Sequence, residues 1–281
     1  AGGVHLHFNS EVVGLKQVNS GENQAPTYFL HFSDGQEEAI DMVILASGGG
    51  YGIGKDEVSD GYALAKGLGH KLTPMHPGIV ALKVEDVDLC QACQGIKVEV
   101  TVQQEGKETV HRDDLLFTSY GLSGIAILKV SNDVLYDLRR GKEAAIVVDF
   151  LPDHRIEDLV EEVVALGRRF PGWPIEKLFS GYLPKVLVEA ISRSGDNMAY
   201  HKNETPAPEE MEAFIRMLKA YRFRVKGQKN KDRGQITCGG IDLDLVNPET
   251  LESKVADNLY FTGEILDVQG ECGGYNLHWA W

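Results

Sequence analysis

The first part of the chain alternates hydrophobic and polar residues with the period of a β-strand. This alternation runs over residues 4–8 and again over residues 28–32, and Asp34-Gly35 then marks a hairpin turn. Residues 42–46 form a continuous apolar run instead, which is typical of a strand buried on both faces. The pattern therefore predicts a small antiparallel meander that leads into a central strand with a glycine-rich loop after it.

The middle of the chain changes from strand-like to helical periodicity. Alternating valines over residues 98–102 precede a hairpin around 105–107, and a helix is expected over 59–68. Apolar residues three and four apart then predict helices over three segments: 156–166, 183–191 and 208–221. Strand-like segments return at 235–245 and 258–262.

This order of elements predicts a discontinuous domain that carries an insert. The flanking segments, 1–73 and 233–281, are each too small to build a full core, so they would have to pack together. The insert, 74–232, is expected to be strand-rich over 74–150 and mainly helical over 151–232. The predicted fold class is therefore α/β (α+β), with the insert as a module of its own.

Net charge limits the expected partners of the chain, and cysteine content indicates its cellular setting. The chain has 28 Lys and Arg residues against 42 Asp and Glu residues, a formal charge of −14, which repels nucleic acid and anionic membranes. Apolar runs are too short for a membrane span, and the four cysteines do not make a disulfide scaffold. We therefore expect a cytoplasmic protein. Cys90 and Cys93 form a C-x-x-C that fits two ordinary thiols best, with a zinc site or a redox pair as alternatives.

Two glycine-rich segments follow predicted strands. The first is Ser47-Gly48-Gly49, where small residues let the backbone come close to a ligand, although the spacing is not G-x-G-x-x-G. The second is Gly263-Glu264 with Asp267, whose carboxylates can accept hydrogen bonds from ribose or ribityl hydroxyls. Each segment, taken alone, is equally well explained as an ordinary turn.

A third glycine-rich segment closes the sequence. Gly273-Gly274 leads into Tyr275-Asn276-Leu277, where a helix is expected to start and to present backbone N–H groups to an anion or to the edge of an electron-rich ring. This segment could also be a bare turn. The occurrence of all three segments, in this order around an insert, indicates a cofactor site.

These segments resemble a flavoprotein family described as NAD(FAD)-utilising dehydrogenases or aminoacetone oxidases. The resemblance is collinear from about residue 10 to Trp281, and its closing motif, 273–281, is highly specific. The matching segments are 43–49, 59–62, 68–70, 115–118, 121–124, 237–240, 252–254, 263–267 and 273–281. His278 departs from the family, which usually has glutamine there, and Ile125 stands where the family tends to have proline.

The resemblance implies an extended FAD bound by a Rossmann-like domain. It implies that Ser47, Gly48 and Gly49 pass close to the cofactor, and that Gly263, Glu264 and Asp267 meet its ribityl and pyrophosphate region. Beside the isoalloxazine it implies five residues: Gly273, Gly274, Tyr275, Asn276 and Leu277. The insert would close over the flavin and define the substrate pocket.

The function implied by the resemblance is that of an FAD-dependent oxidoreductase acting on a small-molecule substrate, with NAD(P)H as a candidate electron donor. The family's opening G-x-G-x-x-G segment has no counterpart, and the family continues past Trp281, so we expect a fragment truncated at both ends. The alternative is a non-catalytic fragment or a partner-binding module that does not hold FAD. The residues themselves identify neither a catalytic acid nor a catalytic base.

Three further features have two interpretations each. Residues 219–233 carry seven cations against Asp232 alone, which indicates a solvated face or a site that attracts a phosphorylated or carboxylate substrate or the phosphates of a nicotinamide cofactor. Cys272 is either an ordinary thiol or a redox partner of the flavin. His278 is either a packed residue or a proton donor near the flavin.

Overall fold

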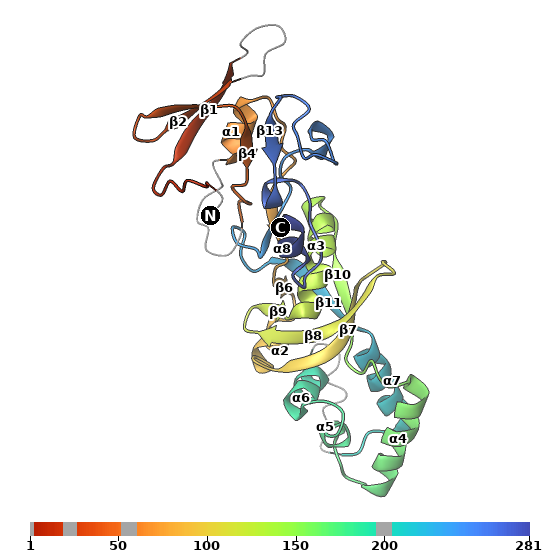
Figure 1. The fold of residues 1–281 in the computed structure, drawn as a ribbon. Coiled ribbons are helices and arrows are strands. Elements are labelled where there is room, and N and C mark those ends of the chain that lie inside the picture. The colour runs from red at the N-terminus through yellow and green to blue at the C-terminus, as the bar shows by residue number, and fades with distance from the viewer. Residues whose placement is uncertain (1–2, 19–26, 52–60, 195–203) are drawn as a thin grey trace. The chain divides into compact units, whose positions relative to one another are not determined.

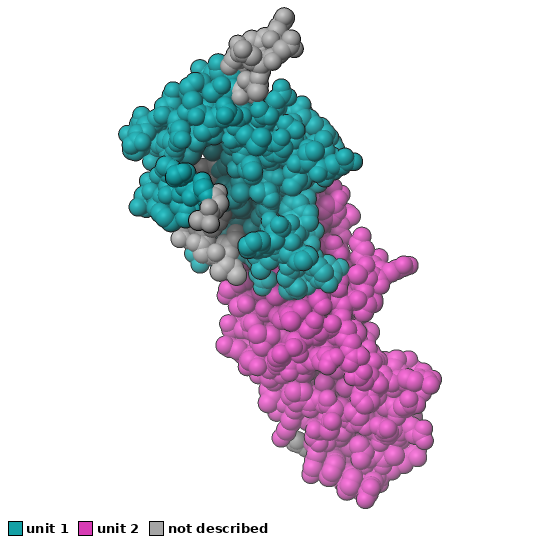
Figure 2. Space-filling view, viewed as in Figure 1, with its two compact units in different colours: residues 1–78, 232–281 teal, residues 79–231 magenta. Residues whose placement is uncertain are grey.

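The computed structural model describes residues 3–18, 27–51, 61–194 and 204–281 (Figure 1). The chain divides into two compact units (Figure 2). Unit 1 consists of Ala1–Gly78 together with Asp232–Trp281, and unit 2 is the continuous segment Ile79–Lys231. Unit 2 therefore falls within the segment 74–232, and both units mix helices with strands.

Unit 1 begins with a three-stranded antiparallel sheet in the order β1-β2-β3. Its strands are β1 (Val12–Val18), β2 (Thr27–Phe32) and β3 (Glu37–Ile40). The predicted turn between β2 and β3 is confirmed, because Gly35 adopts a positive φ of 85° and the Asp34 carboxylate accepts the N–H of Gln36 at 2.9 Å. The strand predicted over residues 4–8 is wrong: Val4, Leu6 and Phe8 lie outside any strand and are exposed.

A parallel strand pair joins the two segments of unit 1. β4 (Val43–Leu45) lies beside β13 (Leu259–Phe261), with Val43 opposite Leu259. Val43 and Leu45 are buried, but Ile44 between them is 62% exposed. The expectation of a strand buried on both faces is therefore wrong, because no described residue covers the outer face of β4.

The remaining elements of unit 1 are short. β5 (His76–Gly78) pairs antiparallel with β12 (Ile236–Cys238). The helical elements are α1 (Gly61–Gly67), η2 (Leu243–Leu245), η3 (Gly263–Ile265) and α8 (Tyr275–Ala280). The predicted start of the first helix, at 59–60, lies outside the described residues. The core of the unit gathers buried residues from both segments: Tyr28, Val43, Leu45, Tyr62, Ile241, Leu259 and Phe261.

A buried histidine links two segments that are distant in sequence. The Nδ1 atom of His70 lies 3.1 Å from the carbonyl oxygen of Ala65, and its Nε2 atom lies 2.9 Å from the hydroxyl of Ser253. Since a carbonyl only accepts, the bond to Ala65 assigns the ring proton to Nδ1, and Nε2 then accepts the hydroxyl proton. The ring also packs edge-on against Phe261 at 4.8 Å. Burial lowers the pKa of His70, against a smaller opposing effect of the bond to Ala65.

Unit 2 is built around a closed barrel in the order β10-β11-β6-β9-β8-β7. The strands are β6 (Leu82–Val84), β7 (Lys97–Gln104), β8 (Val110–Thr118), β9 (Gly121–Ser123), β10 (Ala145–Asp149) and β11 (Tyr221–Gln228). The alternating valines of β7 are buried, and Gly106 at φ 79° turns the hairpin to β8, as the pattern predicts.

Two glycines let the short strand β9 close the barrel. Gly121 has φ 145°, and a Cβ atom there would overlap the carbonyl oxygen of Leu82 on the neighbouring strand. Gly124 has φ 92°, and its Cβ would overlap the carbonyl oxygen of Asp114. Any side chain at either position would push strands apart, so glycine is required there.

Six α-helices in the described part of unit 2 surround or extend the barrel. They are α2 (Val87–Ala92), α3 (Ile125–Arg139), α4 (Ile156–Arg169), α5 (Ile175–Leu178), α6 (Lys185–Arg193) and α7 (Pro208–Lys219). The three helices predicted from periodicity are confirmed by α4, α6 and α7, and Pro208 sits in the first turn of α7. The pattern missed α3 and β11. None of the helices in the described segments is long and apolar enough to cross a bilayer.

Candidate functional site

The parallel pair β4 and β13 brings two of the predicted glycine-rich segments to one edge. Parallel strands end at the same edge of a sheet, and ligands of open α/β sheets bind beyond those carboxyl ends. Ser47-Gly48-Gly49 follows β4, and Gly263-Glu264 follows β13. The N–H of Thr262 donates to the carbonyl of Leu45 at 3.1 Å, so the ends of the two strands are joined directly.

Glu264 is held by a close contact with the loop after β4. The backbone N–H of Thr237 donates to Glu264 Oε1 at 2.5 Å. A Cβ atom at Gly49 would overlap the Thr237 hydroxyl and lie 2.6 Å from the Glu264 carboxyl carbon. Gly49, Thr237 and Glu264, called here the Glu264 cluster, therefore pack so tightly that only glycine fits at position 49.

Thr237 is the member of this cluster that sequence reasoning missed. It is 1% exposed, and its hydroxyl accepts the N–H of Tyr51 at 3.0 Å. The residue lies in the motif 237–240, which carries the family resemblance, but no role was expected for it. The signal was its position in a short strand that is followed directly by two glycines.

Asp267 is fixed in a similar way by the loop after β12. Its Oδ1 atom accepts the N–H of Gly239 at 3.2 Å and a hydrogen bond from the side-chain amide of Gln269. Gly240 has φ 153°, and a Cβ there would lie 2.6 Å from the carbonyl oxygen of Ile265. The segments 239–240 and 265–267 are thus in van der Waals contact, and the Asp267 carboxylate is oriented by backbone.

Each of the two carboxylates keeps one oxygen available. Glu264 Oε2 and Asp267 Oδ2 accept no hydrogen bond from the described residues, and both side chains are only half-buried. Two oriented acceptors at one sheet edge suit a ligand with several hydroxyl groups, such as a ribityl chain.

Tyr62 and Ser47 place α1 beside these carboxylates. The Tyr62 hydroxyl donates to the backbone carbonyl of Glu264 at 3.3 Å. Burial, followed by the charges of Glu264 and Asp267, raises the pKa of Tyr62 above its ordinary value, so the hydroxyl remains a donor. A Cβ on Gly61 would overlap the Ser47 hydroxyl, which brings the start of α1 against the loop after β4.

The third predicted segment forms the start of α8. Gly274 adopts a left-handed conformation at φ 89°, and the Asn276 side chain accepts the N–H of Gly270 at 2.7 Å and donates to its carbonyl at 2.9 Å. Tyr275 and Leu277 are exposed. The contact of α8 with the Glu264 loop runs through its other end, since a Cβ on Gly263 would lie 3.7 Å from the Cβ of Ala280. The structure therefore brings together the first two segments, and the third only through the end of its helix.

Cys90 and Cys93 belong to unit 2, in α2 and at its end. Both are fully buried in the core of unit 2. Burial raises the pKa of Cys90 to about 12 and that of Cys93 to about 11, so both thiols stay protonated at neutral pH. They are ordinary buried thiols. The described part of the chain contains no group of three metal-ligating side chains.

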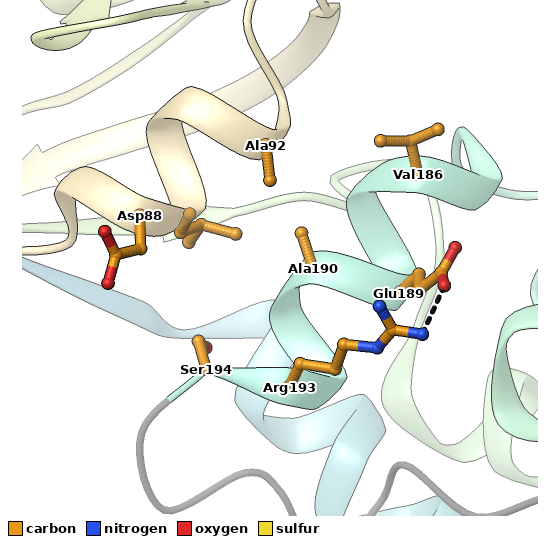
Figure 3. A pocket seen from close by; sticks show the side chains of 8 residues that line it. Asp88, Ala92, Val186, Glu189, Ala190, Arg193 and Ser194 are labelled. Atoms are coloured by element: carbon orange, nitrogen blue, oxygen red, sulfur yellow. Dashed lines mark ion pairs between the residues drawn. The ribbon is translucent and has the colours of Figure 1, made fainter.

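A surface pocket of about 310 Å³ lies between α2 and α6 of unit 2 (Figure 3). Leu89, Ala92, Val186 and Ala190 give it apolar walls. The Glu189 carboxylate and the Arg193 guanidinium at its rim form an ion pair at 2.6 Å, so their charges are already satisfied. Asp88 and Ser194 are the other polar residues of its lining.

Comparison with known proteins identifies the family. The chain matches the HI0933-like protein Rossmann domain over residues 1–281. It belongs to this family. The HI0933-like family is a family of FAD-dependent oxidoreductases, so the resemblance to a flavoprotein family is confirmed at the level of the family.

Three curated relatives are similar to this HI0933-like chain. A 3-dehydro-bile acid delta(4,6)-reductase of Clostridium scindens is 34% identical over 90% of this chain. Ribosomal RNA dihydrouridine synthases are 28% identical over 100% of the chain in Escherichia coli and 26% identical over 99% in Haemophilus influenzae. The chain spans 62%, 66% and 66% of the lengths of these relatives, respectively.

Proposed function

We propose that this protein is an FAD-dependent reductase that saturates an activated carbon–carbon double bond in a small molecule. Family membership supports the flavin, and the names of the relatives support the reaction type. A delta(4,6)-reductase of a 3-dehydro-bile acid and a dihydrouridine synthase each produce a more saturated ring. In both cases the double bond is conjugated to a carbonyl, which activates it toward hydride addition.

The observation that carries the proposal is the Glu264 cluster at the shared edge of β4 and β13. The ribityl chain of a flavin has hydroxyl donors, and the free oxygens of Glu264 and Asp267 are acceptors in fixed positions. Ser47 and Gly48 in the loop after β4 are small and not buried, so the backbone there can approach a planar or polyol ligand closely, whereas Gly49 packs against the cluster. These residues fit a flavin by the chemistry of their free atoms.

The bound flavin would supply the hydride, and NAD(P)H is the candidate source of its electrons. The contribution of the chain is to bind and to orient. Thr237 and Gly239 hold the two carboxylates through backbone N–H groups, so their orientation costs little on binding. Tyr62 keeps its proton next to them and fixes the backbone of Glu264.

The charge of the chain favours a small substrate over RNA. At −14 the protein repels a polyanion, whereas a small neutral or singly charged molecule experiences little of that field. We therefore propose a small unsaturated carbonyl compound as the substrate class.

The test measures flavin binding first. The purified chain is titrated with FAD, with quenching of flavin fluorescence and the shift of the visible band as readouts. We expect Glu264→Gln combined with Asp267→Asn to weaken binding at least about tenfold, because charge-assisted hydrogen bonds are lost. Glu249→Gln, which removes an exposed carboxylate elsewhere in unit 1, is the matched control. If the protein is colourless after excess FAD has been removed, the proposal is contradicted and a partner-binding module is favoured.

The reaction is tested on the flavin-loaded protein without oxygen. NADPH or NADH oxidation is followed with 2-cyclohexenone, and cyclohexanone serves as the saturated control. Turnover with the enone alone supports the proposal. Equal rates with both compounds would exclude reduction of the double bond.

A further inference from the structure

The outer face of β11 carries a row of cations. Arg222, Arg224 and Lys226 occupy alternating exposed positions, while the residues between them are buried in the barrel. They are three of the seven cations in residues 219–233. The flavin site described above uses none of them.

The two outer members of this row are neutralised by acids. The Arg222 guanidinium makes two hydrogen bonds to the Glu105 carboxylate, at 2.6 and 2.7 Å. The Lys226 ammonium forms an ion pair with Glu85. Both cations are therefore committed to partners within unit 2.

Arg224, between them, has a different environment. It lies directly opposite Ala145 on β10, and the small side chain of Ala145 is buried. Within the described segments the Arg224 guanidinium makes no ion pair and no hydrogen bond. A bidentate donor is thus left available on the barrel surface.

A pocket of about 240 Å³ lies beside this guanidinium. Arg224 lines it together with residues of the turn 141–144, and Leu138, Ala144 and Val225 give it an apolar part. Glu85 and Glu143 also line the pocket, as do three cations that are each paired with an acid: Lys142, Arg222 and Lys226. The pocket therefore combines apolar walls with one cation, Arg224, that is available to a ligand.

We propose that this pocket binds a small monocarboxylate with a compact apolar body. The planar guanidinium matches a carboxylate in two parallel hydrogen bonds, and the apolar walls would cover the rest of the ligand. The other cations of the lining are already paired with acids, so Arg224 offers a single positive charge, which one carboxylate neutralises, and Glu143 disfavours a second negative charge. The volume is too small for a dinucleotide, because pockets for drug-sized ligands begin at about 300 Å³. None of its lining residues belongs to the proposed flavin site.

The experiment uses the full chain, ¹⁵N-labelled, and follows amide resonances during titration with benzoate. Benzamide, which has the same shape without the charge, and inorganic phosphate are the comparison probes. We expect benzoate to shift resonances of β11 and of the turn 141–144 in a saturable way. Arg224→Gln should weaken benzoate binding at least about tenfold, since the charged fork is lost. Arg168→Gln, which removes an exposed arginine from α4, should change it less than twofold.

A third variant separates charge from geometry. Arg224→Lys keeps the positive charge but loses the fork, so its affinity for benzoate should lie between those of the wild type and Arg224→Gln. The proposal is overturned if benzamide binds as tightly as benzoate, if phosphate binds more tightly, or if Arg224→Gln binds benzoate like the wild type. Since Arg224 is exposed, unchanged spectra of the free variants check that the fold is intact. The titration needs no flavin, so its outcome is independent of the proposed reductase activity.

Discussion

The two units of the chain differ most in net charge and in the large apolar side chains that they expose. Unit 1 contains 6 Lys and Arg residues against 18 Asp and Glu residues, a formal charge of −12, whereas unit 2 contains 22 against 24, a charge of −2. Together these give the −14 of the whole chain. Unit 1 also exposes large apolar side chains, among them Phe8, Ile44 and Leu277. Unit 2 closes its sheet into a barrel around one large core.

Because of this difference, we expect the stability of the fold to depend mainly on unit 2 and ligand recognition to depend mainly on unit 1. A closed barrel satisfies its own backbone hydrogen bonds and has no free sheet edge, so unit 2 can be stable through its own contacts. Unit 1 is assembled from two distant segments, and its glycine loops meet at the ends of a two-stranded pair. Changes in the core should therefore affect unit 2 most, and changes at close contacts should affect unit 1.

The largest expected effect comes from the barrel core. Phe223 is fully buried and packs against Phe117, Phe150 and Tyr221, with ring centroids 4.7 to 6.5 Å apart. Phe223→Ala should lower the free energy of unfolding of unit 2 by about 3–5 kcal/mol, because it removes apolar area and leaves a cavity. Urea unfolding and amide hydrogen exchange measure the change. Amides of β7 and β10 should lose protection while those of β1 and β2 keep theirs. Equal loss of amide protection in both units would show that they unfold together, which would contradict the independent stability of unit 2.

A smaller effect is expected at the tightest contact of unit 1. Gly49→Ala places a methyl group against Thr237 and Glu264, which should cost about 1–3 kcal/mol and displace the Glu264 carboxylate. Gly67→Ala is the control, since nothing lies within 4 Å of its Cβ position at the end of α1, and it should leave stability unchanged or slightly raised. FAD titration and thermal unfolding of both variants test this. Normal FAD affinity in Gly49→Ala would argue against the Glu264 cluster as the flavin site.

The smallest expected effect is a pH dependence confined to unit 1. Burial lowers the pKa of His70, so the folded unit holds the neutral ring. The unfolded chain protonates near pH 6.5. The contribution of His70 to stability is therefore complete above about pH 6.5 and is lost as the pH falls toward the lower pKa of the folded state. The loss is at most about 1.4 kcal/mol per pH unit. Hydrogen exchange of unit 1 between pH 7.5 and 5 measures it, and His70→Gln, which cannot titrate, should abolish this part of the dependence.

Local patterns in the sequence predicted the elements whose partners are near in the chain. The hairpins at Asp34-Gly35 and around Gly106 and the amphipathic helices α4, α6 and α7 follow from turn chemistry and from periodicity. α3 was missed because its opening run, Ile-Ala-Ile-Leu, is equally compatible with a strand. Alternation in residues 4–8 predicted a strand that has no pairing partner among the described residues, and pattern alone does not supply one.

Some residues of the candidate site were also predicted from local patterns, and others were not. Its glycines and carboxylates stand at strand ends, where position along the chain already indicates a ligand loop. The role of Thr237 depends on a meeting of segments centred on residues 49, 237 and 264, and no local pattern encodes that meeting. The motif 121–124 is the opposite case. Its glycines are required for barrel closure, so they indicate the fold and not a ligand site.

The ends of unit 2 also make it a removable module. Inside unit 2, the N–H of Lys229 donates to the carbonyl of Ala81 at 2.9 Å, so the two ends of the unit lie side by side. In unit 1, the N–H of Gln235 donates to the carbonyl of Gly78 at 3.0 Å and keeps the two connection points adjacent. A short glycine-serine bridge from residue 78 to residue 232 would therefore span the gap left by cutting out 79–231. In evolutionary terms, such a junction allows unit 1 to exchange its insert without redesign of either part.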